Sequence, residues 1–458
     1  MKNMKQFIGF ALALVLVVTS LGSVAFAAEG KRNITIGLWW DRYYDSTQES
    51  VEDNPFYQGT ISDQMLFDVV KKVEEKYDVT IEYQNLTYVG IQESINTSVL
   101  AGTPDCDIYL VDTPIGVPAV MNGYAINMKD ILPADSDIFT DHLVMNYLDL
   151  GDGGAYMIKP VSGQSVVEAT YPLMFNLQMI QDANLEDPRD LYAKGEWTWD
   201  KFAEYCQALT KDTNGDGIID VYGFGGFQQE WFEAMLMSNG TYVASNGTEN
   251  FSAPEVTEVL QFMQDMYVKY NCAYPYAAES ASDVMRFIYR DGKCAFSPGA
   301  AWVLGANADY NWDGSAASTL EFDMVFVQWP VGPSGNQETN KMKLSGGEFY
   351  IIPVGVEDPE LVYNVFYDFT NWYDNDVSIR DDAQTLGWWY GVTGKDLDIQ
   401  DWNFSVMFDM GLREQFDLVS SLNVFPDFLG LFNGDYTPAQ FQETYKQEYQ
   451  DALDRTFK

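Results

Sequence analysis

The hydrophobic pattern of the first quarter of the chain alternates between two periods. Residues 33–38 and 79–83 alternate apolar and polar side chains as strands do, and 108–111 is a short apolar run. Between them, 62–77 repeats its apolar side chains at helical spacing, and 91–100 predicts a second helix. This β-α-β-α-β order predicts a parallel sheet covered by helices on both faces.

A second α/β region is predicted to begin near residue 161. Thr198 stands where a side chain would cap a helix beginning at residue 199. The predicted elements are helices at 199–209, 230–237, 254–270 and 438–457, and strands at 322–328 and 349–353. No repeat or low-complexity linker separates the two regions, which favours lobes joined by more than one crossing of the chain.

The loops that follow the first and third predicted strands carry candidate ligand-binding residues. Open α/β sheets bind ligands at the carboxyl edge of their strands. Trp39, Trp40 and Asp41 follow the first strand, and Asp112 follows the third. Aromatic rings with carboxylates suit a sugar, because rings stack on its C–H faces and carboxylates accept its hydroxyl protons. We expect one of the two adjacent tryptophans to point into the core, and core packing of both is the alternative.

Several classes of protein are excluded or disfavoured. The chain lacks Gly-x-Gly-x-x-Gly and P-loop motifs, so nucleotide binding has no support. Its only histidine, His142, has no nucleophile motif nearby, which disfavours Ser-His-Asp, Cys-His and histidine-zinc sites. Glycoside hydrolases need only two carboxylates and stay open as an alternative. A net charge of -42 argues against binding to nucleic acids or anionic membranes.

The amino terminus has the features of an export signal. Two lysines precede an apolar run, and Ala25–Ala27 provides the small-x-small pattern of a cleavage site. We therefore expect residues 1–27 to be removed, and no later apolar stretch is long enough to span a bilayer. The four cysteines do not form a disulfide framework. Cys272 and Cys294 are interpreted either as a bridged pair or as buried free thiols.

The loop from residue 212 to residue 220 resembles the first nine positions of an EF-hand calcium loop. Oxygen side chains alternate along it, with a glycine in sixth place, and the expected ligands are Asp212, Asn214, Asp216, the Ile218 carbonyl and Asp220. The twelfth position is Gly223 instead of a bidentate glutamate. A structural calcium ion is the favoured interpretation, and a solvated turn is the alternative.

Several segments in a fixed order resemble the extracellular solute-binding protein family of carbohydrate ABC importers. These segments are 101–105, 171–176, 183–188, 197–202, 212–225, 291–302, 330–333 and 345–347. The resemblance implies two α/β lobes with doubly wound sheets and a hinge, with the ligand enclosed between the lobes. Residues 28–160 and 330–378 would form lobe 1, and residues 161–329 and 379–458 would form lobe 2.

The resemblance also assigns site residues. Trp302 is the strongest candidate for stacking on the ligand, and Trp197 and Trp199 are assigned to helix docking. The complete set of candidate ligand-binding residues is Trp40, Asp41, Asp112, Trp231, Trp302, Gly347, Glu348 and Trp388.

The predicted function is therefore the extracytoplasmic substrate-binding component of an ABC importer. It would capture a carbohydrate and deliver it to permease subunits as a monomer, without catalysis and with no cofactor besides the possible calcium. The alternatives are a secreted glycoside hydrolase and a binder of peptides or polyamines with the same fold. No cysteine precedes Cys106, so the lipid anchor that Gram-positive members of the family carry is not expected.

Overall fold

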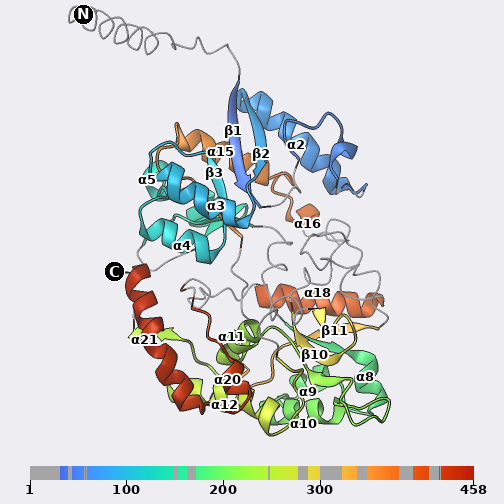
Figure 1. Ribbon diagram of the computed structural model, residues 1–458. Coiled ribbons are helices and arrows are strands. Elements are labelled where there is room, and N and C mark those ends of the chain that lie inside the picture. The colour runs from blue at the N-terminus through green and yellow to red at the C-terminus, as the bar shows by residue number, and fades with distance from the viewer. Residues whose placement is uncertain are drawn as a thin grey trace, which may run out of the picture.

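The chain folds into two lobes, each built on its own β-sheet (Figure 1). The computed structural model describes residues 31–39, 44–55, 57, 59–148, 153–161, 172–245, 248–276, 287–299, 322–337, 348–380, 396–411, 422 and 424–457. The predicted signal segment, residues 1–27, lies outside these residues. Among the described residues, no helix is long and apolar enough to cross a membrane.

The sheet of lobe 1 is mixed. Its strands are β1 (Arg32–Leu38), β2 (Val79–Asn85), β3 (Ile108–Val111), β4 (Met145–Tyr147), β5 (Ile158–Pro160) and β12 (Phe349–Ile351), in the order β2-β1-β3-β12-β5-β4. Strands β1, β2 and β3 are parallel, which confirms the parallel β-α-β-α-β prediction. Strand β12 enters this sheet on the chain's return from lobe 2 and is antiparallel to β3 and β5.

Helices cover both faces of this sheet and bury two apolar clusters. The helices are η1 (Val51–Asp53), α2 (Ile61–Tyr77), α3 (Tyr88–Ser94) with its π-helical continuation η2 (Ile95–Val99), α4 (Thr113–Met121), α5 (Met128–Ile131), α6 (Asp137–Thr140), α15 (Pro359–Thr370) and α16 (Val377–Arg380). The helical period in 62–77 places Val69, Val70 and Val73 against the sheet, where they are buried. Thr60 and Asp63 form the capping box that starts α2.

The sheet of lobe 2 has the order β11-β6-β10-β7. Its strands are β6 (Leu173–Asn176), β7 (Tyr222–Phe224), β10 (Cys294–Pro298) and β11 (Met324–Val327), beside a short hairpin of β8 (Ala244–Ser245) and β9 (Thr248–Glu249). Strands β7 and β10 are parallel, and β6 is antiparallel to both β10 and β11. Two mixed α/β sheets therefore confirm the predicted two-lobed class, with more antiparallel pairing than doubly wound sheets have.

The helices of lobe 2 surround a large aromatic core. They are α8 (Leu177–Asp182), α9 (Pro188–Ala193), α10 (Trp199–Leu209), α11 (Gln228–Ser238), α12 (Pro254–Val268), α18 (Leu397–Gly411), α20 (Leu429–Phe432) and α21 (Pro438–Phe457). Trp197 is buried and donates from Nε1 to the Gln328 carbonyl at 3.1 Å. Trp199 stacks on Phe262 with ring centroids 4.8 Å apart. The assignment of both tryptophans to helix docking is confirmed.

The chain passes back and forth between the two lobes. Strands β6 to β11 lie in lobe 2, β12 and α15 return to lobe 1, and α18 packs on β11 of lobe 2, where Asn403 accepts a 2.8 Å hydrogen bond from the Phe326 amide. More than one crossing therefore joins the lobes. The predicted lobe boundaries stay a prediction, because the segments 162–171, 338–347 and 381–395 lie outside the described residues.

Candidate functional site

Three segments meet at the edge of lobe 1 that faces lobe 2. The arrowheads of β1 and β2 point toward lobe 2 (Figure 1), and β3 is parallel to them. Trp39 follows β1, Tyr88 begins the helix that follows β2, and Asp112 follows β3. The carboxyl ends of all three parallel strands therefore bring an aromatic or acidic side chain to one edge.

Asp112 is fixed by two hydrogen bonds. Its Oδ1 accepts from the Ile115 amide at 3.0 Å, which makes it the N-cap of α4, and its Oδ2 accepts from the Tyr88 hydroxyl at 2.8 Å. Burial raises the pKa of the Asp112 carboxyl to about 6, and the hydrogen bonds from Tyr88 and Ile115 oppose this rise. Asp112 is thus an oriented hydrogen-bond acceptor in a largely dry setting.

An aromatic pair stands beside this carboxylate. The Trp39 and Tyr88 rings meet edge to face, with centroids 5.4 Å apart, and the Tyr88 side chain is 45% exposed. Trp39 is half-buried against both apolar clusters of lobe 1, as expected for one of the two adjacent tryptophans. Trp40 and Asp41 lie outside the described residues.

The same edge also carries Glu348 and Thr113. The pairing of Phe349 with Val111 makes Glu348 the next residue toward the edge, opposite Asp112, and Glu348 is half-buried. Thr113 is 6% exposed, and its Oγ1 makes no hydrogen bond within the described part of the chain. A buried hydroxyl in this state is an uncommon feature that a ligand can satisfy.

Lobe 2 presents the start of helix α11. This helix follows β7 after Gly225 and Gly226, and it lies on the side of lobe 2 nearer to lobe 1 (Figure 1). A Cβ on Gly226 would come within 2.2 Å of Pro298, so only glycine allows this close turn. Phe227 occupies the N-cap position without a capping side chain, which leaves the amides of the first turn to other acceptors.

All eleven residues of α11 are buried, although several are polar. Gln228 is 2% exposed, and neither atom of its side-chain amide makes a hydrogen bond with any described residue. Burial raises the pKa of the Tyr267 hydroxyl, and hydrogen bonding toward the Gln228 amide opposes this rise, so the two side chains lie near each other without meeting the geometry of a formed bond. Glu230 and Glu233 are 2% and 3% exposed, and Gln229 donates to Glu233 at 2.8 Å. Burying a polar group costs free energy unless it forms a hydrogen bond, so these side chains need partners in the protein or in a ligand.

Trp231 is a core residue in this structure. It is 0% exposed, and its ring lies 4.5 Å from that of Phe224 and 6.2 Å from that of Phe432, measured between centroids. Its ring faces are covered by these neighbours, which corrects the sequence-based expectation that it stacks on a ligand. Trp302, Gly347 and Trp388 lie outside the described residues.

The loop proposed to bind calcium forms a series of tight turns. Asp212 accepts from the amides of Gly215 and Gly217 at 2.6 and 2.7 Å, and these glycines have φ values of 80° and 87°. The hydrogen bond from the Gly217 amide, and then that from Gly215, hold the pKa of Asp212 below its usual range. The pKa of Asp220 is lowered mainly by hydrogen bonds from Thr213.

These carboxylates are not drawn together as a formed site. Among the described residues, no group of three or more histidine, cysteine, aspartate or glutamate side chains is placed to hold a metal. Asp212 and Asp216 are exposed, Asp220 is half-buried, and all three hydrogen-bond within their own loop. The calcium assignment therefore stays a prediction. The four cysteines are buried free thiols, which decides against the Cys272–Cys294 bridge.

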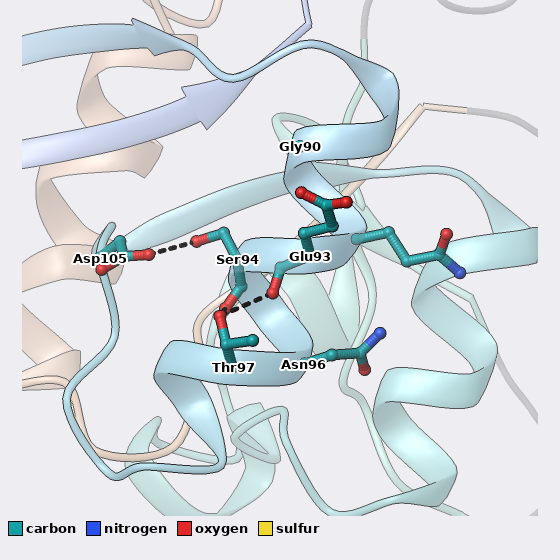
Figure 2. Close-up of a pocket in the computed structure, with 7 residues that line it drawn as sticks. Gly90, Glu93, Ser94, Asn96, Thr97 and Asp105 are labelled. Carbon is teal, nitrogen blue, oxygen red and sulfur yellow. Dashed lines mark hydrogen bonds between the residues drawn. The ribbon is translucent and has the colours of Figure 1, made fainter.

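A polar hollow of about 660 Å³ lies on another face of lobe 1, along α3 and η2 (Figure 2). Its lining residues are Gly90, Gln92, Glu93, Ser94, Asn96, Thr97 and Asp105. The Ser94 hydroxyl bridges Asp105 at 2.7 Å and Tyr109 at 2.8 Å. None of its lining residues has an aromatic ring, so it lacks the stacking surface that Trp39 and Tyr88 provide at the sheet edge.

The structure adds three candidate residues that the sequence-based prediction did not name. Tyr88 could have been found, because it follows the second strand of the same parallel sheet. Thr113 is adjacent to the predicted Asp112 and has no distinguishing pattern. Gln228 follows a three-residue strand, and only its burial in the folded chain sets it apart.

Two α/β lobes joined by more than one crossing, with polar side chains at both facing edges, are the arrangement of proteins that close around a ligand by a hinge. A family described as bacterial extracellular solute-binding protein matches residues 68–389, more than half of the chain. The protein belongs to this family of bacterial extracellular solute-binding proteins.

Solved structures of similar fold agree with this assignment. An ABC substrate-binding protein of Listeria monocytogenes in complex with cycloalternan is 14% identical, with a TM-score of 0.60 over 93% of this chain and 99% of that chain. The maltose/maltodextrin-binding domain MalE of Bdellovibrio bacteriovorus, bound to maltotriose, is 14% identical, with a TM-score of 0.53 over 92% and 98%. UgpB of Mycobacterium tuberculosis, in complex with glycerophosphocholine, is 14% identical, with a TM-score of 0.60 over 94% and 100%. At this identity the likeness shows the fold.

Proposed function

We propose that this protein is the extracytoplasmic binding component of an ABC importer and that it captures a carbohydrate between its lobes without chemical change. The observation that carries the proposal is that the facing edges of the two lobes present complementary groups for a sugar. Lobe 1 offers an aromatic pair beside the oriented acceptor Asp112, and lobe 2 offers the buried amide of Gln228. A sugar hydroxyl both donates and accepts hydrogen bonds. It therefore matches the Gln228 amide and the Thr113 hydroxyl, which can also donate and accept and form no hydrogen bond with a described residue.

Closure follows from the division of these groups between two lobes. A ligand bound to one lobe gains the contacts of the other lobe only in the closed arrangement, so it favours that arrangement by its differential affinity. The closed form is then the form that the permease subunits recognise. Export after cleavage near Ala27 and a monomeric state belong to the same proposal.

The chemistry favours a sugar over the other ligands of this fold. UgpB, of the same fold, is in complex with glycerophosphocholine, so fold alone does not select a sugar. A phosphodiester would be repelled by Glu230 and Glu233 and by Asp112, which is ionised at neutral pH. A polyamine would be attracted by these carboxylates but would leave the Gln228 amide without a matched hydroxyl.

Calorimetric titration of the purified protein with cycloalternan, maltotriose, glycerophosphocholine and spermidine tests the proposal. We expect binding of at least one oligosaccharide and none of glycerophosphocholine. Reducing-end analysis of the same samples tests the hydrolase alternative, because Asp112 and Glu348 are two carboxylates at one edge. New reducing ends, or binding of spermidine alone, would overturn the proposal.

A further inference from the structure

Helix α21 is firmly attached to lobe 2. Gln442 on this helix donates to the Phe251 carbonyl at 2.7 Å, and Gln450 accepts from the Glu249 amide at 3.0 Å. Ala452 and Leu453 are 1% and 2% exposed within the lobe 2 core. Because both its start and its last third are anchored in this way, α21 must move with lobe 2.

The C-terminal end of α21 nevertheless reaches lobe 1, where α21 contacts helix α4 (Figure 1). Helix α4 starts at its cap Asp112 and is apolar on every side, and six of its nine residues are buried. A Cβ on Gly116 would come within 2.8 Å of Val111, so this side of α4 lies on the sheet. A helix that is apolar all round needs cover on its other sides as well. Part of that cover comes from the other lobe.

Two of the chain's crossings leave lobe 1 after Val161 and Arg380, and the chain re-enters lobe 1 at Glu348, opposite Asp112. Arg380 donates to the carbonyls of Leu143 and Val161 at 3.2 and 3.3 Å, and the Tyr373 hydroxyl donates to the Leu143 carbonyl at 3.2 Å. Val161 and Arg380 are the last described residues before the chain twice leaves lobe 1. Helix α16, which ends at Arg380, and the contact between α21 and α4 lie on opposite sides of the molecule in Figure 1.

We propose that the last turn of α21 is a strap that holds the two lobes together across α4. A rotation of the lobes that moves lobe 2 away from this side of lobe 1 separates α21 from α4. This separation exposes apolar surface of α4 to water, which costs free energy in proportion to the area exposed. The strap therefore stabilises the arrangement of the lobes in this structure without a ligand. Since α4 begins at Asp112, a ligand at the lobe 1 edge and the strap act on the same helix.

The experiment measures the distance between the lobes in the full chain. Spin labels are placed at Leu100→Cys in lobe 1 and Ile218→Cys in lobe 2, which are 69% and 67% exposed. The native thiols are buried, so only the introduced cysteines react. Pulsed electron–electron double resonance then measures the distance between the labels in the parent protein, in a variant lacking residues 455–458, and in the point variant Thr456→Lys. Glu448→Ala, on the exposed face of the same helix, is the matched control.

We expect the fraction of the unliganded protein that keeps the parent distance between the lobes to fall about fivefold in the truncated and Thr456→Lys variants, and to be unchanged in Glu448→Ala. Unchanged distances in a truncated protein with native circular dichroism would overturn the strap. Unfolding of both variants would also overturn it, because the end of α21 would then be part of the lobe 2 core. The measurement needs no ligand, so it stands even if no sugar binds.

Discussion

The Tyr88 hydroxyl donates a 2.8 Å hydrogen bond to Oδ2 of Asp112 and so joins the first residue of α3 to the cap of α4. This bond fixes the orientation of the carboxylate and holds the Tyr88 ring against Trp39. Two helices that follow different strands are thereby combined into one surface at the edge of the sheet. The candidate site of lobe 1 depends on this pair.

Replacing Tyr88 by phenylalanine removes the hydrogen bond and keeps the ring. We expect the affinity for a bound oligosaccharide to fall about tenfold or more, since a hydrogen bond to a charged group contributes about 1.5–3 kcal/mol. Calorimetry measures this effect, and Tyr436→Phe, at an exposed tyrosine of lobe 2, is the control. Equal affinities for Tyr88→Phe and the parent protein would contradict the role of this pair in ligand binding.

Asp112 should make the stability of the protein depend on pH. Its pKa in the folded state, about 6, lies above the 3.8 of an ordinary aspartate, so the folded protein binds this proton more tightly. Its contribution to the free energy of unfolding is complete below about pH 4 and is lost as the pH rises to about 6, a loss of roughly 2–3 kcal/mol.

Asp112→Asn is the matched test, because asparagine also caps helices and does not titrate in this range. Urea denaturation at several pH values should show the parent protein losing stability relative to the variant between about pH 4 and pH 6. Parallel stability profiles would show that Asp112 is not buried as the structure has it.

Replacing Gln228 should lower the affinity for the ligand without lowering the stability of the protein. Gln228→Leu removes a buried amide that makes no hydrogen bond with any described residue, so the melting temperature should stay the same or rise. Oligosaccharide affinity should fall about tenfold or more, because the ligand loses its partner on lobe 2. Gln229→Leu is the control, and it should lower stability because Gln229 bonds to Glu233. A Gln228→Leu protein with parental affinity would remove this residue from the site.

Calcium should stabilise the protein if the loop from residue 212 to residue 220 closes around it. We expect 1 mM calcium to raise the melting temperature of chelator-treated protein by about 2 °C or more, whereas magnesium at the same concentration does not. Asp216→Asn should abolish the calcium effect. An equal response to both cations would favour the solvated turn.

The main elements were predictable because each has a strong local pattern. Helix α10 and strand β3 have the predicted bounds, and Thr198 caps α10 by accepting from the Lys201 amide. The extra turn of α3 at Tyr88 was missed because Tyr88 and Val89 face solvent and add nothing to the apolar stripe. The mixed direction of the sheets was also missed, since strand pairing across 200 residues leaves no local pattern.

The sequence by itself determined the two α/β regions, the family and the placement of Asp112 at the edge of a parallel sheet, because short-range periodicity and strand order carry that information. Only the tertiary structure decided that Trp231 packs in the core and that Gln228, three residues before it, is buried without a hydrogen bond to any described residue. Burial and hydrogen bonding depend on which distant segments pack together. The order of residues along one helix therefore does not reveal which of its side chains pack in the core and which lack a hydrogen bond.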